Sequence, residues 1–263
     1  MLRALINSQI WLSRVFDQLL PPKFTLNGNR HFIESFAPQH IAENTTVYDI
    51  GGGKNPYLNL DRKKELNARV VGLDIDPEEL SRAPQGAYDE TICTSITSFK
   101  GNHDADVVIC QALLEHVNGV EAAFASISSI LKTGGVALIF VPSRNAIFAR
   151  LNLLLPQSVK KAVLHSIFPH TQRDQGFPAY YDKCTPSQFK KLAARHEMDV
   201  VDEKYYYTSS YFSFCFPAYV LWRGWVLLFH AVRGEQAAET FSMALQKCSR
   251  DASEHQPPQK TAV

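Results

Sequence analysis

A short apolar run at residues 47–50 leads directly into three consecutive glycines, Gly51, Gly52 and Gly53. Because glycine has no Cβ, a loop of glycines lets a ligand approach the backbone and allows a tight turn out of a strand. Such a loop is typical of the first strand of an open α/β sheet, where ligands bind at the carboxyl ends of parallel strands. The loop therefore predicts both a fold class and the place of a binding site.

Similar short apolar runs recur along the middle of the chain, at residues 70–73, 107–110 and 136–141. Parallel strands that are buried on both faces have this nearly continuous apolar character. The stretches between the runs are long enough for crossover helices, and the clearest helix signal covers residues 120–131, before a turn at Thr133. Alternating strands and helices predict a doubly wound α/β fold with a mostly parallel sheet.

The two ends of the chain differ from this central pattern. Residues 1–20 carry apolar side chains at helical spacing and are followed by Pro21 and Pro22. They predict an amphipathic helix within an N-terminal arm at residues 1–40. The tail at residues 249–263 is rich in Gln, Pro, Lys and Ser and is predicted to be disordered.

A single domain is predicted for residues 41–248, with two insertions. The first insertion, at residues 143–185, contains several prolines and two apolar helical patches, at residues 146–155 and 159–168, and is expected to form a helical cap. The second insertion, at residues 208–237, is apolar and aromatic. The other elements expected in this part of the domain are a helix from Thr185 to His196 and strands at residues 198–207 and 239–247.

The composition fits an ordinary folded protein and excludes several kinds of partner. Hydrophobic residues make up 45% of the 263 residues, which excludes a disordered or fibrous chain. The 27 Lys and Arg residues almost balance the 26 Asp and Glu residues, so no overall field draws the chain to nucleic acid. The five cysteines are scattered without a CxxC pair, which predicts neither a metal site nor a disulfide framework. Because no secretory segment is visible, the protein is expected to be cytoplasmic.

Asp74 ends the second apolar run and is the next candidate for ligand binding. A carboxylate at this position can accept hydrogen bonds from both hydroxyls of a ribose, although a simple polar strand terminus is the alternative. A nicotinamide dinucleotide is disfavoured, because the GxGxxG spacing that begins at Gly51 would need a glycine where Pro56 stands. Asp49 would repel a phosphate and attract a cationic group such as an amine.

Together these motifs resemble those of the class I S-adenosylmethionine-dependent methyltransferases, in particular the domain 11-like group that acts on small molecules, lipids and glycans. The resemblance spans residues 47–141 and implies a Rossmann-like sheet of seven strands, S-adenosyl-L-methionine as cofactor, and transfer of a methyl group. The matching motifs are Asp49-Ile50-Gly51-Gly52-Gly53, Gly72-Leu73-Asp74, Leu114-Glu115-His116-Val117 following Asp106-Val107-Val108, and Leu131-Lys132-Thr133-Gly134-Gly135.

The resemblance also implies which residues bind the cofactor. Two positions depart from the family pattern: Asn55 stands where many members have a glycine, and Thr94 where many have an aspartate that accepts from the adenine amino group. The hydroxyls of Thr94 and Ser95 can take over that contact. The residues expected at the cofactor site are Asp49, Gly51, Gly52, Gly53, Asp74, Ile75, Thr94, Ser95 and Gln111.

Methyl transfer from a sulfonium needs mainly an aligned acceptor and the exclusion of water. A hydroxyl acceptor benefits in addition from a general base, and His116 is the candidate for that role, so O-methylation is favoured. A hydrogen-bonded structural histidine is the alternative. The cap residues that are candidates for shaping the acceptor site, unless they form a solvated loop, are His165, His170, Tyr180, Tyr181 and Asp182.

The segment at residues 211–232 is strongly apolar and aromatic, but Pro217, Arg223 and Gly224 disfavour a transmembrane span. Burial is the default expectation. The open alternatives are a helix packed under the cap, a homodimer contact, or an interfacial anchor with Trp222, Arg223 and Trp225 at headgroup depth. An anchor would place the protein peripherally at a membrane and would suit a lipid-like acceptor.

The sequence therefore favours a methyltransferase that acts on a small-molecule, lipid-linked or glycan acceptor and has no nucleic acid partner. The alternative from another class is a catalytically silent Rossmann-like protein that serves as a membrane- or partner-binding module. Thr94 is the best argument for the silent protein. The intact glycine loop and Asp74 argue against it, because a protein without a ligand has no physical need for either.

Overall fold

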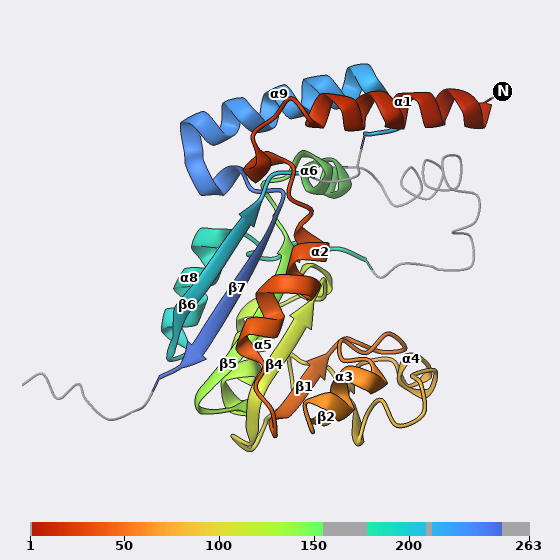
Figure 1. Ribbon diagram of the computed structural model, residues 1–263. Helices are drawn as coiled ribbons and strands as arrows, with labels where there is room; N and C mark the ends of the chain where they lie inside the picture. Colours follow the sequence, from red (N-terminus) through yellow and green to blue (C-terminus); the bar gives the residue numbers. More distant parts are fainter. Residues whose placement is uncertain (1, 155–177, 209–211, 249–263) are drawn as a thin grey trace, which may run out of the picture.

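The computed structural model describes residues 2–154, 178–208 and 212–248 (Figure 1). These residues contain a seven-stranded sheet with the strand order β3-β2-β1-β4-β5-β7-β6. Strand β7 runs antiparallel to its neighbours β5 and β6, and the other adjacent strands are parallel. The predicted doubly wound, mostly parallel sheet of seven strands is confirmed.

The strands and helices have the following bounds. The strands are β1 (Thr46–Ile50), β2 (Arg69–Asp74), β3 (Glu90–Cys93), β4 (Ala105–Gln111), β5 (Leu131–Pro142), β6 (Met198–Tyr206) and β7 (Thr240–Lys247). The α-helices are α1 (Leu2–Asp17), α2 (Gly28–His31), α3 (Leu60–Glu65), α4 (Pro77–Ser81), α5 (Val120–Ile130), α6 (Ile147–Leu154), α8 (Pro186–Arg195) and α9 (Phe216–Arg233). Short 3-10 or π turns are η1 (Pro22–Phe24), η2 (Phe32–Phe36), η3 (Ala37–His40), η4 (Leu114–His116) and η6 (Gly234–Ala237).

The expected elements are present, with two differences. The sequence pattern missed β3, because this edge strand is mostly exposed and carries no apolar run. Strand β5 begins at Leu131, earlier than the predicted start at residue 136, since Leu131 pairs with Ala105 before the register shifts. The apolar patch at residues 146–155 forms α6, whereas the patch at residues 159–168 and the tail lie outside the described residues.

Apolar side chains cover both faces of the sheet. In β4 the side chains alternate, so that Val108 and Cys110 pack on the side of α5 and α8, where Phe124 and Phe189 meet edge to face 5.0 Å apart. Val107 and Ile109 pack on the opposite side with the η2 turn. Because every strand at the centre of the sheet is covered on both faces, the sites open to a ligand are at the strand ends.

A third apolar cluster lies where α9 packs along α1, beyond the edge at which the parallel strands end (Figure 1). Helix α9 follows β6 and precedes β7, which places it at the carboxyl end of the parallel strands. The amphipathic helix predicted for residues 1–20 is therefore α1, and the apolar segment at residues 211–232 forms α9. Within the described ranges, no helix combines the length and the apolar character that crossing a lipid bilayer requires.

Arg223 holds this cluster together from within. Its side chain is 1% exposed, its guanidinium donates to the carbonyls of Tyr207 and Phe24 at 2.6 Å each, and its Nε lies 3.1 Å from Asp17 Oδ1. Burial, the default expectation for this segment, holds for Trp222 and Arg223, whereas Trp225 is 44% exposed, so of the three residues named for an interfacial anchor only Trp225 lies at the surface.

Candidate functional site

The glycine loop makes a sharp turn out of β1 that only glycine adopts without strain. Gly51 and Gly53 have φ of +75° and +49°, in the left-handed region. Gly52 has a different reason, since an added Cβ would collide with Asp49 Oδ2 and would lie 2.7 Å from the Tyr88 hydroxyl. Two of the three glycines therefore serve the conformation of the backbone, and the third serves close packing.

Asp49 holds this loop in place from below. Its carboxylate is 3% exposed, and Oδ2 accepts a hydrogen bond of 2.7 Å from the backbone N–H of Tyr57. The Tyr88 hydroxyl, whose single proton can bond to one acceptor at a time, lies 3.0 Å from the Gly53 carbonyl and 3.4 Å from Asp49 Oδ2. Burial raises the pKa of Asp49 to about 6. The sequence analysis did not find Tyr57 or Tyr88, because both are ordinary aromatic residues in loops.

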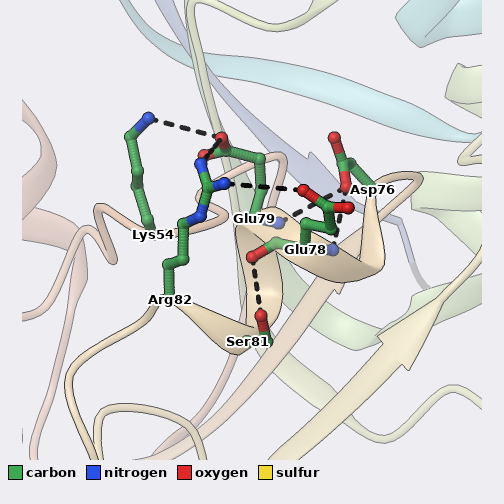
Figure 2. A network of polar contacts seen from close by, with 6 residues as sticks. All are labelled: Lys54, Asp76, Glu78, Glu79, Ser81 and Arg82. Carbon is green, nitrogen blue, oxygen red and sulfur yellow. Dashed lines mark hydrogen bonds and ion pairs between the residues drawn. The ribbon is translucent and has the colours of Figure 1, made fainter.

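The far end of the loop is tied to α4, as Figure 2 shows. Asp76 caps this helix, since its Oδ1 accepts from the N–H groups of Glu78 at 2.9 Å and Glu79 at 3.4 Å. Lys54, which follows the glycines, donates to Glu79 Oε1 at 3.3 Å. Arg82 lies 3.5 Å from both Glu78 and Glu79. The contact between Lys54 and Glu79 joins the loop after β1 to the helix that follows β2.

Asp74 lies at the end of β2, as predicted. Its Oδ1 accepts a hydrogen bond of 2.9 Å from the N–H of Asp76, and burial raises its pKa above the usual value. A Cβ added to Gly53 would lie 3.2 Å from Asp74 Oδ2, so this oxygen borders the glycine loop. The Asp74 carbonyl accepts from the N–H of Thr94 at 2.9 Å, which links the ends of β2 and β3.

A cavity of about 390 Å³ opens at the carboxyl ends of β1, β2 and β4. Six of the predicted residues line it: Gly51, Asp74, Ile75, Thr94, Ser95 and His116. Its volume lies in the usual range of small-molecule sites, about 300–1,000 Å³. The predicted residues that do not line it are Asp49, Gly52, Gly53 and Gln111.

The donor set of this cavity fits an adenosyl group. Asp74 presents carboxylate oxygens, which accept from hydroxyls, and the side chain of Ile75 is 62% exposed at the cavity wall, which offers apolar surface to a flat ring. The Ser95 hydroxyl lies 2.9 Å from the hydroxyl of Thr97 and accepts from the Thr97 N–H at 3.3 Å. Thr94 lines the cavity at the position where the family has its adenine-binding acid.

Gln111 lies at the end of β4 but points to another partner. Its side-chain amide donates to Asn29 Oδ1 at 2.8 Å, which joins the end of the strand to α2. The same short helix packs tightly on the sheet, since a Cβ on Gly28 would lie 2.8 Å from the ring of Tyr206. His31 places Nδ1 3.0 Å from the Tyr206 hydroxyl. Helix α2 thus covers strand ends next to the cavity.

Ala112, directly after β4, also lines the cavity and has a φ of +49°, in the left-handed region. Its N–H donates to the carbonyl of Phe140 at 2.8 Å, which fixes the conformation. A residue with a Cβ costs about 1–2 kcal/mol in this region. Such backbone strain is common at ligand sites, but it leaves no signal in a sequence.

His116 belongs to the η4 turn and borders the cavity. Its Nδ1 lies 3.1 Å from the carbonyl of Pro178, and because a carbonyl can only accept, Nδ1 carries the proton of the neutral ring. The nitrogen that can take up a proton is therefore Nε2, which lies 3.8 Å from Glu115 Oε1. The hydrogen-bonded arrangement and the exposure to the cavity allow both the structural and the catalytic role.

Glu115 belongs to the same motif as His116 but was not among the predicted site residues. Its carboxyl is 4% exposed, and Oε2 has no hydrogen-bond partner among the described residues. Burial raises the pKa of Glu115 to about 8, so the carboxyl is mostly neutral at pH 7. Because the Glu115 carboxyl is mostly neutral, it does not place a negative charge beside the His116 imidazole.

Residues 178–185, here called the strap, contact the chain that follows β4. The N–H groups of Tyr180 and Tyr181 donate to the Glu115 carbonyl at 2.8 and 3.0 Å. Asp182 Oδ2 accepts from the N–H groups of Gly119 and Val120 at 3.2 and 3.1 Å, which caps α5 from a distance. These cap residues therefore position the η4 turn, whereas His165 and His170 lie outside the described residues.

In the described part of the chain, no group of three or more His, Cys, Asp or Glu side chains is placed to hold a metal ion.

Several solved structures share this fold at low identity. A SAM-dependent methyltransferase from Methanosarcina mazei is 17% identical, with a TM-score of 0.50 over 81% of this chain and 97% of that chain. One from Archaeoglobus fulgidus is 13% identical, with a TM-score of 0.51 over 89% and 98%. Phosphoethanolamine N-methyltransferase 2 from Haemonchus contortus, in complex with S-adenosyl-L-methionine, is 15% identical, with a TM-score of 0.51 over 91% of this chain and 57% of that chain.

At these identities the likeness shows the fold, which is that of the class I methyltransferases. No match to the chain was found among curated proteins. Residues 48–139 match a protein family described as a methyltransferase domain. The resemblance predicted from the motifs, and S-adenosylmethionine as the cofactor, are thereby confirmed, and residues 48–139 are an S-adenosylmethionine-dependent methyltransferase domain.

Proposed function

We propose that this protein transfers a methyl group to a hydroxyl of a small-molecule, lipid-linked or glycan acceptor in the cytoplasm. The proposal rests on the cavity at the carboxyl ends of β1, β2 and β4. Six residues that were predicted for the site of a methyltransferase line this cavity, and all six belong to the matched methyltransferase domain. Bound S-adenosylmethionine supplies a methyl group on a sulfonium, which is already activated for transfer. The chain has to bind, align and desolvate the reactants.

The binding contacts fall into two groups. Gly51, Asp74, Ile75, Thr94 and Ser95 border the cavity, and we propose that they contact the cofactor, with the Asp74 carboxylate accepting from the ribose. The other predicted residues do not border the cavity. Asp49, Gly52 and Gly53 shape the loop from behind the cavity wall, and Gln111 reaches a ligand only after releasing its hydrogen bond to Asn29.

His116 is the proposed general base. With the proton on Nδ1 fixed by the Pro178 carbonyl, Nε2 would accept the proton of an acceptor hydroxyl. The neutral Glu115 beside it does not hold the proton on the imidazole at pH 7. The apolar side chains of Leu113 and Val117, which also line the cavity, exclude water from the reactants.

The test of cofactor binding is calorimetry of the full chain with S-adenosylhomocysteine. We expect Asp74→Ala to weaken binding by about 1.5–3 kcal/mol, roughly 10–150-fold, which corresponds to one or two charged hydrogen bonds. Asp61→Ala, which removes an exposed carboxylate of α3, is the matched control and should leave the affinity unchanged. Equal affinity for wild type and Asp74→Ala would refute the assignment of Asp74.

The test of catalysis is incubation with labelled cofactor and fractions of a cell extract, followed by identification of the labelled product. His116→Ala should lower turnover by about 10²–10⁴-fold while the affinity for S-adenosylhomocysteine stays the same. An unchanged rate would leave His116 with its structural role. A protein that binds S-adenosylhomocysteine but labels nothing would favour the catalytically silent module, for which Thr94 in place of the adenine-binding acid is the supporting observation.

A further inference from the structure

The outer face of α9 is entirely nonpolar. Between residues 217 and 232 every exposed residue lacks a polar side chain, and four large ones form a stripe: Leu221 is 76% exposed, Trp225 44%, Leu228 61% and Val232 70%. Their spacing of four, three and four residues places them on one side of the helix. The other exposed residues of this stretch are Pro217, Gly224 and Ala231.

Two polar side chains in the middle of α9, those of Tyr219 and Arg223, point inward, which reverses the usual arrangement of a surface helix. Tyr219 and Arg223 are buried against α1 and the chain around Phe24 and Tyr207. Soluble monomers rarely expose an apolar patch that covers a whole helix face of about 22 Å. The arrangement therefore indicates a surface that is covered by something in the functioning protein.

The exposed charges on the two segments that form this face have one sign, and the first acid beyond them is the exposed Glu235, which follows α9 by two residues. Residues 2–24 and 212–233, which form the α1/α9 layer, contain five Lys and Arg residues and a single acid, Asp17. Asp17 lies 3.1 Å from the buried Arg223, and its Oδ2 accepts from the Tyr219 hydroxyl. The exposed charged residues of the layer are all cationic: Arg3, Arg14, Lys23 and Arg233.

We propose that the α1/α9 layer binds an anionic lipid surface, with α9 lying flat in the headgroup region. Exposed apolar residues enter the acyl boundary, exposed Trp11 and Trp225 occupy the interface, and the four exposed cations attract anionic lipids. A second copy of the chain is a poorer occupant, because two such layers face to face would bring like charges together.

The α1/α9 layer lies near the end of the sheet at which ligands bind. Helix α9 lies at the carboxyl end of the parallel strands (Figure 1). The cavity opens at the same end of the sheet. A membrane bound there would lie on the side of the molecule from which an acceptor approaches. The inference does not rest on the proposed reaction, since it concerns only the exposed surface of two helices.

Vesicle flotation of the full-length protein tests the proposal. We expect wild type to float with vesicles of phosphatidylglycerol and phosphatidylcholine, more weakly with phosphatidylcholine alone, and less as salt is raised. The double variant Leu221→Glu/Leu228→Glu should lose at least tenfold in binding, because both leucines are exposed and the change does not disturb the core. Val201→Glu, at a residue of β6 that is 48% exposed, is the matched control and should bind like wild type.

The charges are tested separately with Arg3→Glu/Arg14→Glu, which should abolish the preference for anionic vesicles. Thermal melting of each variant confirms that it folds. Wild type that stays with the unbound fraction, or that binds both vesicle types equally, would overturn the proposal. So would a dimer in sedimentation analysis that dissociates in Leu221→Glu/Leu228→Glu without any binding to vesicles, because a second copy would then cover the face.

Discussion

Asp49 in the glycine loop and Arg223 in the α1/α9 layer are both buried charged residues, but they are accommodated in opposite ways. Asp49 has a backbone N–H and a hydroxyl as neighbours and, within the described residues, no ion pair, and burial raises its pKa to about 6. Arg223 has a carboxylate at 3.1 Å and two carbonyl acceptors, and it remains charged.

The partners also differ in their distance along the chain. Asp49 is held by Tyr57 and Tyr88, which follow within the same half of the domain, whereas Arg223 is held by Tyr207 and by Asp17 and Phe24 near the start of the chain. The glycine loop is therefore held by residues close to it in sequence, and the buried acid beneath it has a raised pKa. The α1/α9 layer is built by distant segments around a permanent charge, and its failure should affect stability first.

Arg223→Ala should have the largest effect of the changes considered. Removing one partner of a buried ion pair leaves Asp17 uncompensated, and the free energy of unfolding should fall by about 3–5 kcal/mol. Chemical denaturation at pH 7 measures this loss. The double variant Asp17→Asn/Arg223→Met removes both charges and should recover a large part of it. A loss below about 1 kcal/mol in Arg223→Ala would contradict the role assigned to the pair.

Glu115→Gln should change how stability depends on pH, because Glu115 is the extreme case of a buried acid without a cation. The unfolded chain releases this proton near pH 4.5 and the folded protein near pH 8. Between these values the unfolded state binds fewer protons, so raising the pH lowers the free energy of unfolding, by roughly 2–4 kcal/mol.

Denaturation curves recorded from pH 4 to 9 should therefore slope downward for wild type and less steeply for Glu115→Gln. The slope that remains below about pH 6 should belong to Asp49 and Asp74, whose raised pKa values act in the same direction. Parallel curves for the two proteins would show that Glu115 is charged in the folded state, and the contrast with Arg223 would then disappear.

Gly52→Ala should disturb the glycine loop itself. The new Cβ collides with Asp49 Oδ2 and the Tyr88 hydroxyl, and strain of this kind costs about 1–3 kcal/mol. Because the loop borders the cavity, part of that cost should appear as affinity for S-adenosylhomocysteine reduced by roughly tenfold, measured by calorimetry. Wild-type affinity of Gly52→Ala for S-adenosylhomocysteine would show that the loop can shift to accommodate the Cβ without weakening ligand binding.

Gly224→Ala is the matched change in the other region and should have the smallest effect. Gly224 lies inside α9 with no atom within 4 Å of an added Cβ, and its φ is not in the left-handed region. Alanine favours a helix interior by about 1 kcal/mol over glycine, so thermal melting should show a slightly more stable protein. A destabilised Gly224→Ala would indicate that this glycine has a contact on the outer face.

What could be predicted from the sequence follows the distance between interacting residues. The glycine loop and Asp74 each sit in a short motif, so the parallel sheet and six cavity residues followed from local patterns. Strand β3 has no apolar run, and Tyr88 reaches the loop from 35 residues beyond Gly53. From the sequence, Arg223 was interpreted as a charge that disfavours a span or as part of an interfacial anchor, because its partner Asp17 is about 200 residues away and no local pattern connects the two.

The capping of α5 by Asp182 has a consequence for how the chain assembles. Gly119 has no side chain to cap the helix, so the first turn depends on a carboxylate 62 residues beyond Val120. During synthesis the hydrogen bonds that cap this turn form only after Asp182 has left the ribosome. The start of α5 should thus be among the last parts of the methyltransferase domain to become protected from hydrogen exchange.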